Sequence, residues 1–109
     1  MRTIADVGYD LHLTRAEDWY ESEAAPLLLD EWLAAARGAA ELTETSVYAD
    51  GDGRPVFVLG SDPSGGPAFY WGDGRVVVRG AAEDDVATCV ELARRLGVNL
   101  IGDDGEIYT

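Results

Sequence analysis

The stretch Arg75-Val76-Val77-Val78-Arg79, with the residues that follow it as far as position 101, decides the fold. Three consecutive valines are apolar on both faces of a strand, which predicts a central strand covered by a helix on one side. Apolar residues recur at helical spacing over 82–96, and 98–101 has the composition of another strand. This order of strand, helix and strand predicts a right-handed βαβ crossover.

Further short strands are predicted on both sides of this unit. Residues 9–14 alternate apolar and polar side chains, which is typical of a half-buried strand. The composition of four other segments predicts strands at 42–49, 55–59, 68–71 and 106–108. Turns rich in Gly and Asp separate several of them, at 50–53, 72–74 and 102–105.

Two helical elements are predicted between the first two strands. Thr14 and Glu17 have the spacing of a capping box, which predicts a short helical turn that carries Trp19. A longer helix follows, in which Trp32 lies on the apolar face and Gly38 marks the end.

Together these elements predict one α+β domain that spans residues 1–109. The expected architecture is a single mixed, mostly antiparallel sheet of about five to six strands, with two helices packed on one face. A chain of 109 residues buries about two-thirds of its unfolded surface in one core, and 47 % hydrophobic residues supply that core. No segment is apolar over the ~18 residues needed to span a bilayer, and no basic leader is present. We therefore expect a soluble, cytoplasmic protein.

The formal net charge of −13 limits the partners that the chain can bind. Asp and Glu account for 21 residues, and the 8 basic residues are all arginines. Such a surface repels phosphate backbones and anionic membranes, and it attracts basic proteins. We therefore expect a basic protein partner, with no direct binding to nucleic acid or membrane.

Residues that support metal or cofactor chemistry are scarce. One histidine and one cysteine cannot supply a tetrahedral zinc site, and Cys89 is expected to be a buried apolar residue of the 82–96 helix. The segment 50–53 begins like a calcium-binding EF-hand loop, but Pro55 replaces the turn glycine that such a loop requires. The chain has no lysine and therefore no P-loop. We predict no cofactor, no metal site and no catalytic residue.

His12 is the only side chain whose ordinary pKa lies near neutrality. On a strand it shares a face with Asp10 and Thr14, so the sequence allows an Asp–His pair. A catalytic triad also needs a nucleophile, and Ser61 does not lie in a G-x-S-x-G turn. We expect His12 to be a polar residue on the solvent face of an edge strand. The alternative is a small ligand-binding domain or enzyme with a polar pocket around Asp10 and His12 or around 103–106.

Two acidic segments that contain aromatic residues form the predicted partner-binding surface. Carboxylates pair with arginine through two hydrogen bonds, and aromatic rings accept its guanidinium through cation–π contact. For the second segment, a metal site or the cap of an exposed turn is the alternative. The predicted residues are Glu17, Asp18, Trp19, Glu21 and Glu23 in the first segment, and Asp103, Asp104 and Glu106 in the second.

Four stretches of the chain form a further pattern, namely Tyr9-Asp10-Leu11-His12-Leu13-Thr14-Arg15-Ala16 with Trp19, Asp30-Glu31-Trp32-Leu33, Gly72-Asp73-Gly74-Arg75-Val76-Val77-Val78 and Gly102-Asp103-Asp104-Gly105-Glu106-Ile107-Tyr108. In these stretches the chain resembles a group of small acidic uncharacterised bacterial proteins. The group has an Asn-Pro step before its long helix, where this chain has Gly80-Ala81-Ala82. The resemblance implies the fold and attaches no activity, cofactor or catalytic residue.

These observations favour a non-enzymatic acidic interaction protein. Its concrete form is an immunity or inhibitor protein that covers the basic active site of a partner such as a nuclease toxin, after electrostatically steered association. An even spread of charge over the surface would remove the basis of this hypothesis. A third interpretation is adaptation to high salt, in which case folding would require molar salt.

Overall fold

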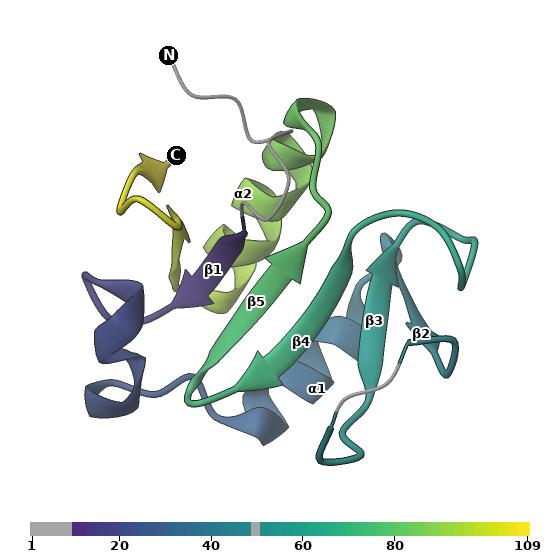
Figure 1. The fold of residues 1–109 in the computed structure, drawn as a ribbon, viewed down its shortest axis with the longest axis horizontal. Coiled ribbons are helices and arrows are strands. Elements are labelled where there is room, and N and C mark those ends of the chain that lie inside the picture. The colour runs from purple at the N-terminus through teal and green to yellow at the C-terminus, as the bar shows by residue number, and fades with distance from the viewer. Residues whose placement is uncertain (1–9, 49–50) are drawn as a thin grey trace.

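The computed structural model describes residues 10–48 and 51–109. The described strands form one seven-stranded sheet in the order β2-β3-β4-β5-β1-β6-β7 (Figure 1). Every pair of neighbouring strands is antiparallel. The strands are β1 (Leu11–Thr14), β2 (Leu42–Thr45), β3 (Val56–Leu59), β4 (Ala68–Gly72), β5 (Arg75–Arg79), β6 (Asn99–Gly102) and β7 (Ile107–Tyr108).

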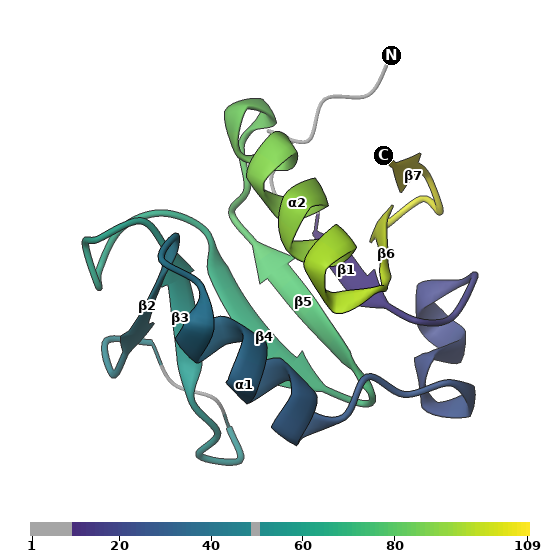
Figure 2. The ribbon, with the colours of Figure 1, turned by 180° about the vertical axis from the view of Figure 1, so that it is seen from behind.

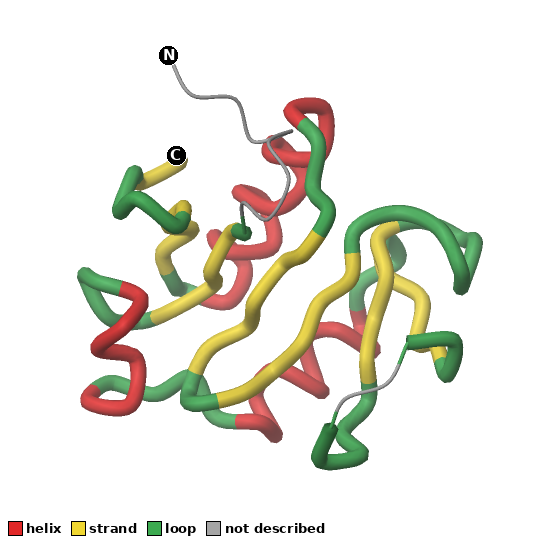
Figure 3. The backbone as a smooth tube through the Cα atoms, viewed as in Figure 1, coloured by secondary structure: helices red, strands yellow, loops and turns green. Residues whose placement is uncertain are grey.

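Two α-helices cover one face of this sheet. Figure 2 shows α1 (Leu29–Gly38) across the β3–β4 half and α2 (Val86–Leu96) across the half that contains β5 and β1. Two short 3₁₀ segments, η1 (Trp19–Ala24) and η2 (Glu83–Asp85), precede the two helices along the chain (Figure 3). Within the described residues, no helix combines the length and the apolar character that crossing a bilayer requires.

The α+β class and the placement of both helices on one face are confirmed. Over the described residues the sheet has seven strands instead of five or six, and none of the pairs between neighbouring strands is parallel. The strand predicted at 42–49 ends at Thr45, and β7 has two residues. Parts of the predicted first strand, second strand and following turn, namely Tyr9, Ala49 and Asp50, lie outside the described residues.

The predicted crossover exists, but its two strands are not neighbours in the sheet. β1 lies between β5 and β6 and is antiparallel to both, so β5 and β6 run in the same direction. In this register His12 faces Val77 on one side and Ile101 on the other. The sequence-based expectation that His12 lies on an edge strand is therefore wrong, because the chain inserts its first strand into the middle of the sheet.

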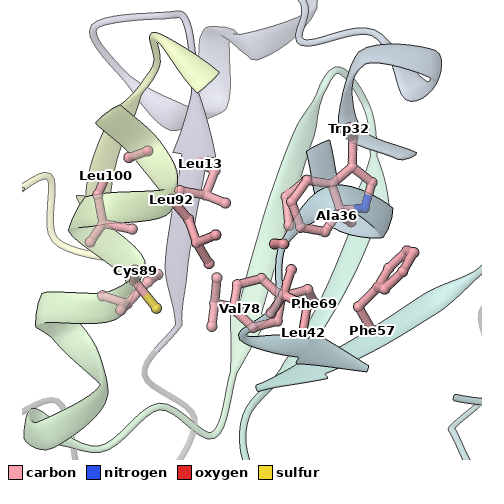
Figure 4. Packing of buried hydrophobic residues seen from close by; sticks show 14 of the residues in the cluster. Leu13, Trp32, Ala36, Leu42, Phe57, Phe69, Val78, Cys89, Leu92 and Leu100 are labelled. Atoms are coloured by element: carbon pink, nitrogen blue, oxygen red, sulfur yellow. The ribbon is translucent and has the colours of Figure 1, made fainter. Parts of the chain in front are cut away.

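The core lies between the sheet and the two helices. Trp32 of α1 is fully buried, stacks 5.9 Å from Phe69 of β4 and meets Phe57 of β3 edge-on at 5.8 Å (Figure 4). Cys89 of α2 is also fully buried, as predicted, and burial raises the pKa of its thiol to about 12. Each large apolar side chain buried here contributes about 1.5–3 kcal/mol, so this layer holds the sheet and helices together.

The long helix predicted at 82–96 is present, and its first turn is the 3₁₀ segment η2. The Asp85 carboxylate accepts a hydrogen bond from the Ala82 backbone N–H at 2.9 Å, which caps that turn. Gly97 ends the helix with φ +70°, a left-handed conformation that glycine adopts at low cost.

The turn between β4 and β5 fixes the chain that leads into α1. Asp73 and Gly74 both have positive φ, of 52° and 79°, as the tight turns of antiparallel hairpins require. The Gly74 carbonyl accepts the Leu27 backbone N–H at 2.8 Å, and the Trp71 indole N–H donates to the Leu27 carbonyl at 2.8 Å. The segment between η1 and α1 is thereby tied to the end of the hairpin.

Candidate functional site

His12 lies at the centre of a polar cluster on the sheet face that the α-helices do not cover. Its Nε2 is 2.7 Å from Asp103 Oδ1, and its Nδ1 is 3.3 Å from Arg75 Nε. The Arg75 Nε–H can only donate, so Nδ1 accepts, and Nε2 carries the proton that is donated to Asp103. The geometry assigns one neutral tautomer to this imidazole.

Burial keeps His12 in this neutral form. The residue is only 3 % exposed, and the pKa of His12 is lowered mainly by burial, with a smaller contribution from the positive charge of Arg75. The hydrogen bond and the negative charge of Asp103 act in the opposite direction. Protonation of Nδ1 would also place two donors, the imidazolium N–H and the Arg75 Nε–H, against each other.

Asp103 ties the turn between β6 and β7 to the start of β1. Its Oδ2 accepts the Asp10 backbone N–H at 2.9 Å, and its own N–H donates to the Asp10 carbonyl at 3.1 Å. The pKa of the Asp10 carboxyl is raised, first by burial and then by the charge of Asp103. Arg79, 3.8 Å away, opposes that rise. The turn is therefore tied to His12 of β1 and to the backbone of the residue that precedes β1.

Trp19 covers this cluster. Its indole ring stacks on the His12 ring with centroids 4.4 Å apart and planes 5° from parallel. The indole N–H donates to the Asp103 carbonyl at 3.2 Å, and the Arg75 guanidinium carbon lies 5.2 Å from the ring centroid. Trp19 thus joins η1 to the β6–β7 turn, although the two segments are far apart in the sequence.

Two hydroxyl groups fasten the rest of η1 to the sheet. The Thr14 and Ser22 hydroxyl oxygens are 2.7 Å apart, and the Ala16 backbone N–H donates to Thr14 Oγ1 at 3.1 Å. The predicted short helical turn that carries Trp19 is confirmed. The predicted capping box is wrong, because the segment begins at Trp19 and Thr14 instead bonds within its own turn and to Ser22.

The carboxylates of this region face solvent. Glu17, Glu21 and Glu23 are exposed, and no basic side chain of the described chain forms an ion pair with any of them. Asp18 and Glu21 raise the pKa of the exposed Tyr20 hydroxyl, with Asp18 as the larger cause. The electrostatic potential at the surface of η1 is therefore negative.

Most described arginines form ion pairs with carboxylates outside the acidic segment 17–23. Arg15 binds Glu31 through two hydrogen bonds of 2.8 and 2.7 Å. Arg95 binds Glu41 in the same bidentate way, at 3.0 and 2.7 Å. Because Asp and Glu far outnumber Arg, such pairs leave the carboxylates of η1 in excess. The remaining arginines with an acidic neighbour are Arg37 with Glu44, Arg54 with Asp52, Arg79 with Asp10, and Arg94 with Glu91.

The structure brings both sets of predicted site residues into one region. Asp10 and His12, predicted as an alternative ligand site, contact Asp103 of the predicted partner-binding set directly. Asp104 is exposed on the same turn, and Glu106 is half-buried with its carboxylate 3.4 Å from the Tyr108 hydroxyl.

Sequence reasoning missed Arg75 and Ser22, which orient His12 and η1. The signal for Arg75 was present in the alternation of Arg75, Val77 and Arg79 along β5, which places the arginines on one face. No sequence pattern pointed to Ser22, because its partner Thr14 is recognised only after the chain has folded.

The His12 imidazole is not placed to act as a general base. Both ring nitrogens of His12 are occupied by Asp103 and Arg75, and the ring is covered by Trp19. A general base needs a free nitrogen within reach of a substrate proton. Among the described residues, no group of three or more His, Cys, Asp or Glu side chains is placed to hold a metal ion. Comparisons with protein-family models, with curated proteins and with solved structures find no match for this chain.

Proposed function

We propose that this protein binds a basic protein partner through the acidic surface formed by η1 and the β6–β7 turn. This acidic surface consists of Glu17, Asp18, Glu21, Glu23 and Asp104. The observation that carries the proposal is the hydrogen bond from Trp19 to the Asp103 carbonyl, which holds the two acidic segments side by side. Figures 1 and 2 both place these two segments at the same side of the molecule.

The carboxylates of η1 are not needed for local structure. Asp18 precedes η1 without a side-chain hydrogen bond to its backbone, and Glu17 and Glu23 form no ion pair with the described basic residues. By contrast, Asp85 caps its own turn and Glu31 pairs with Arg15. Carboxylates without a local partner are available to the arginines and lysines of another protein.

The acidic surface is also held rigidly. Stacking of Trp19 on His12 and the Thr14–Ser22 contact fix η1 before a partner arrives. A surface that is ordered in advance loses less conformational entropy on binding. The high negative charge steers a basic partner toward it and raises the association rate. An inhibitor or immunity protein that covers a cationic, phosphate-binding active site is the form of this function that the charge favours.

Two triple variants with the same change in net charge test the proposal. Glu17→Gln/Glu21→Gln/Glu23→Gln removes charge from the acidic surface, and Asp30→Asn/Glu83→Gln/Asp84→Asn removes it from exposed helix starts. With octa-lysine as the probe at low salt, we expect the first variant to bind about tenfold more weakly than the second. Equal losses in the two variants would show that only the overall charge matters, and the proposal would be wrong.

A further inference from the structure

An open hollow of about 360 Å³ lies next to the acidic surface, between the η1–α1 connection and the end of the β4–β5 hairpin. Two carboxylates, Glu23 and Asp73, contribute to its lining, and both are exposed. Neither forms an ion pair with a basic side chain of the described chain. Leu28, with 55 % of its surface exposed, and the half-buried ring of Trp71 supply an apolar wall.

The walls of this hollow are fixed in position. The Trp71 indole N–H donates to the Leu27 carbonyl, and the Leu27 N–H donates to the Gly74 carbonyl, both at 2.8 Å. The Asp73 side chain projects from a tight turn with φ of 52°. The hollow is therefore present before any partner binds.

The contact between Arg54 and Trp71 shows that a guanidinium group suits the Trp71 ring. The guanidinium carbon of Arg54 lies 5.0 Å from the centroid of the Trp71 ring, and the Arg54 N–H donates to the Trp71 carbonyl at 3.4 Å. Asp52, 2.8 Å from Arg54, balances that charge. The remaining charge of the hollow, from Glu23 and Asp73, is negative.

We infer that this hollow receives an arginine side chain of the basic partner. The inference rests on the proposed function and specifies how the partner is recognised. The methylene stem of the arginine packs on Leu28, and its planar guanidinium reaches Glu23 and Asp73 beside the Trp71 ring. Arginine suits this site better than lysine because its guanidinium forms forked hydrogen bonds with carboxylates and stacks on aromatic rings.

Binding of octa-arginine and octa-lysine to single-residue variants tests the inference. Asp73→Asn keeps a residue that tolerates positive φ and removes one charge from the hollow. The matched control Asp84→Asn removes the same charge from η2, which Figure 1 shows at the opposite end of β5. We expect Asp73→Asn to weaken octa-arginine binding about threefold and octa-lysine binding by less than about 1.5-fold. Asp84→Asn should weaken both peptides equally and only slightly.

The outcomes separate this inference from the proposed function. If the wild-type protein binds neither peptide at low salt, the proposed function fails. If it binds both, and Asp73→Asn leaves its preference for arginine unchanged, the proposed function stands and the inference fails. An NMR titration with N-acetylarginine amide is the second measurement. The ligand should shift the indole N–H resonance of Trp71 and leave that of the buried Trp32 unchanged. An unshifted Trp71 resonance at saturating ligand would also overturn the inference.

Discussion

The His12 Nε2–H donates to Asp103 Oδ1 across 2.7 Å, and this contact joins the interior strand β1 to the β6–β7 turn. Since Trp19 rests on the same imidazole and bonds to the same turn, the pair also determines where η1 lies. A buried neutral histidine and a half-buried carboxylate thus form the support on which the acidic surface is presented.

The free energy of unfolding should depend on pH through His12. Its pKa is lowered in the folded state, so the unfolded chain binds more protons once the pH falls below about 6.5, the ordinary pKa of histidine. Stability is therefore complete above that value and decreases as the pH falls from there to the folded-state pKa, by at most about 1.4 kcal/mol per pH unit. Chemical denaturation from about pH 7 to about pH 5 measures this slope.

The control for this pH dependence is His12→Gln, which cannot titrate. Its stability will be lower at every pH, but the slope above about pH 5 should vanish. The raised pKa of Asp10 changes stability in the opposite direction, because protonation of this carboxyl favours the folded state. This effect is confined to the pH range in which carboxylates ordinarily titrate. An unchanged slope in His12→Gln would contradict the assignment of a buried neutral imidazole.

Truncation of Asp103 should destabilise the protein. Asp103→Ala leaves the His12 Nε2–H and the Asp10 backbone N–H without their acceptor. Unpaired buried donors cost about 1–3 kcal/mol, so the midpoint of urea unfolding should fall by a corresponding amount. Glu17→Gln, an exposed carboxylate on η1, serves as the control and should change stability by less than about 0.5 kcal/mol. Equal stability of the two variants would show that Asp103 does not support the cluster.

Gly74 should tolerate alanine poorly. A Cβ at this position would lie 2.9 Å from the Ser22 carbonyl oxygen and 3.0 Å from Pro26 Cβ, with φ at +79°. Gly53 has nearly the same φ, +76°, but no atom within 4 Å of such a Cβ. Both alanine variants therefore carry similar backbone strain, and Gly74→Ala should lose about 1 kcal/mol or more beyond Gly53→Ala because of crowding. Equal unfolding midpoints would mean that the η1–α1 connection does not pack against the hairpin end.

Tyr20 offers a direct measure of the potential above η1. The pKa of its hydroxyl is raised above the ordinary range of tyrosine, with the charge of Asp18 as the largest cause and that of Glu21 as a smaller one. Asp18→Asn should bring the Tyr20 pKa back toward its ordinary value, as followed by NMR of the tyrosine ring during alkaline titration. Asp84→Asn should leave it unchanged. If the Tyr20 pKa is unchanged in Asp18→Asn, the Asp18 carboxylate is screened by solvent or points away from the Tyr20 hydroxyl.

The predictable part of the fold is the part set by local pattern. The alternation of residues 11–14, the apolar face of α2 and the Asp-Gly turn of the β4–β5 hairpin are each encoded within a few residues. The position of β1 is different, because its pairing with β5 and β6 is non-local. Nothing in the alternation at 11–14 distinguishes an edge strand from a central one, and the error about His12 followed from this.

For the candidate site, the residue types were predictable and their contacts were not. Clustered carboxylates beside Trp19 and in 103–106 stand out in the sequence. Their juxtaposition depends on the chain returning through β6 next to β1, which places Asp103 beside His12. The alternation along β5 indicates the face on which Arg75 lies, but its contact with His12 depends on the pairing of β1 with β5. The contact of Ser22 with Thr14 depends on how η1 folds back on β1, which no local pattern encodes.

The central claim is that a basic partner binds at the acidic surface on η1 and the β6–β7 turn. Its most direct test is an NMR titration of the isotope-labelled protein with octa-lysine at low salt, in which every backbone amide is followed. The account predicts that the shifted amides cluster in 15–25 and 102–106 and that salt reverses the shifts. Shifts centred on 82–86, or spread evenly over the surface, would contradict it.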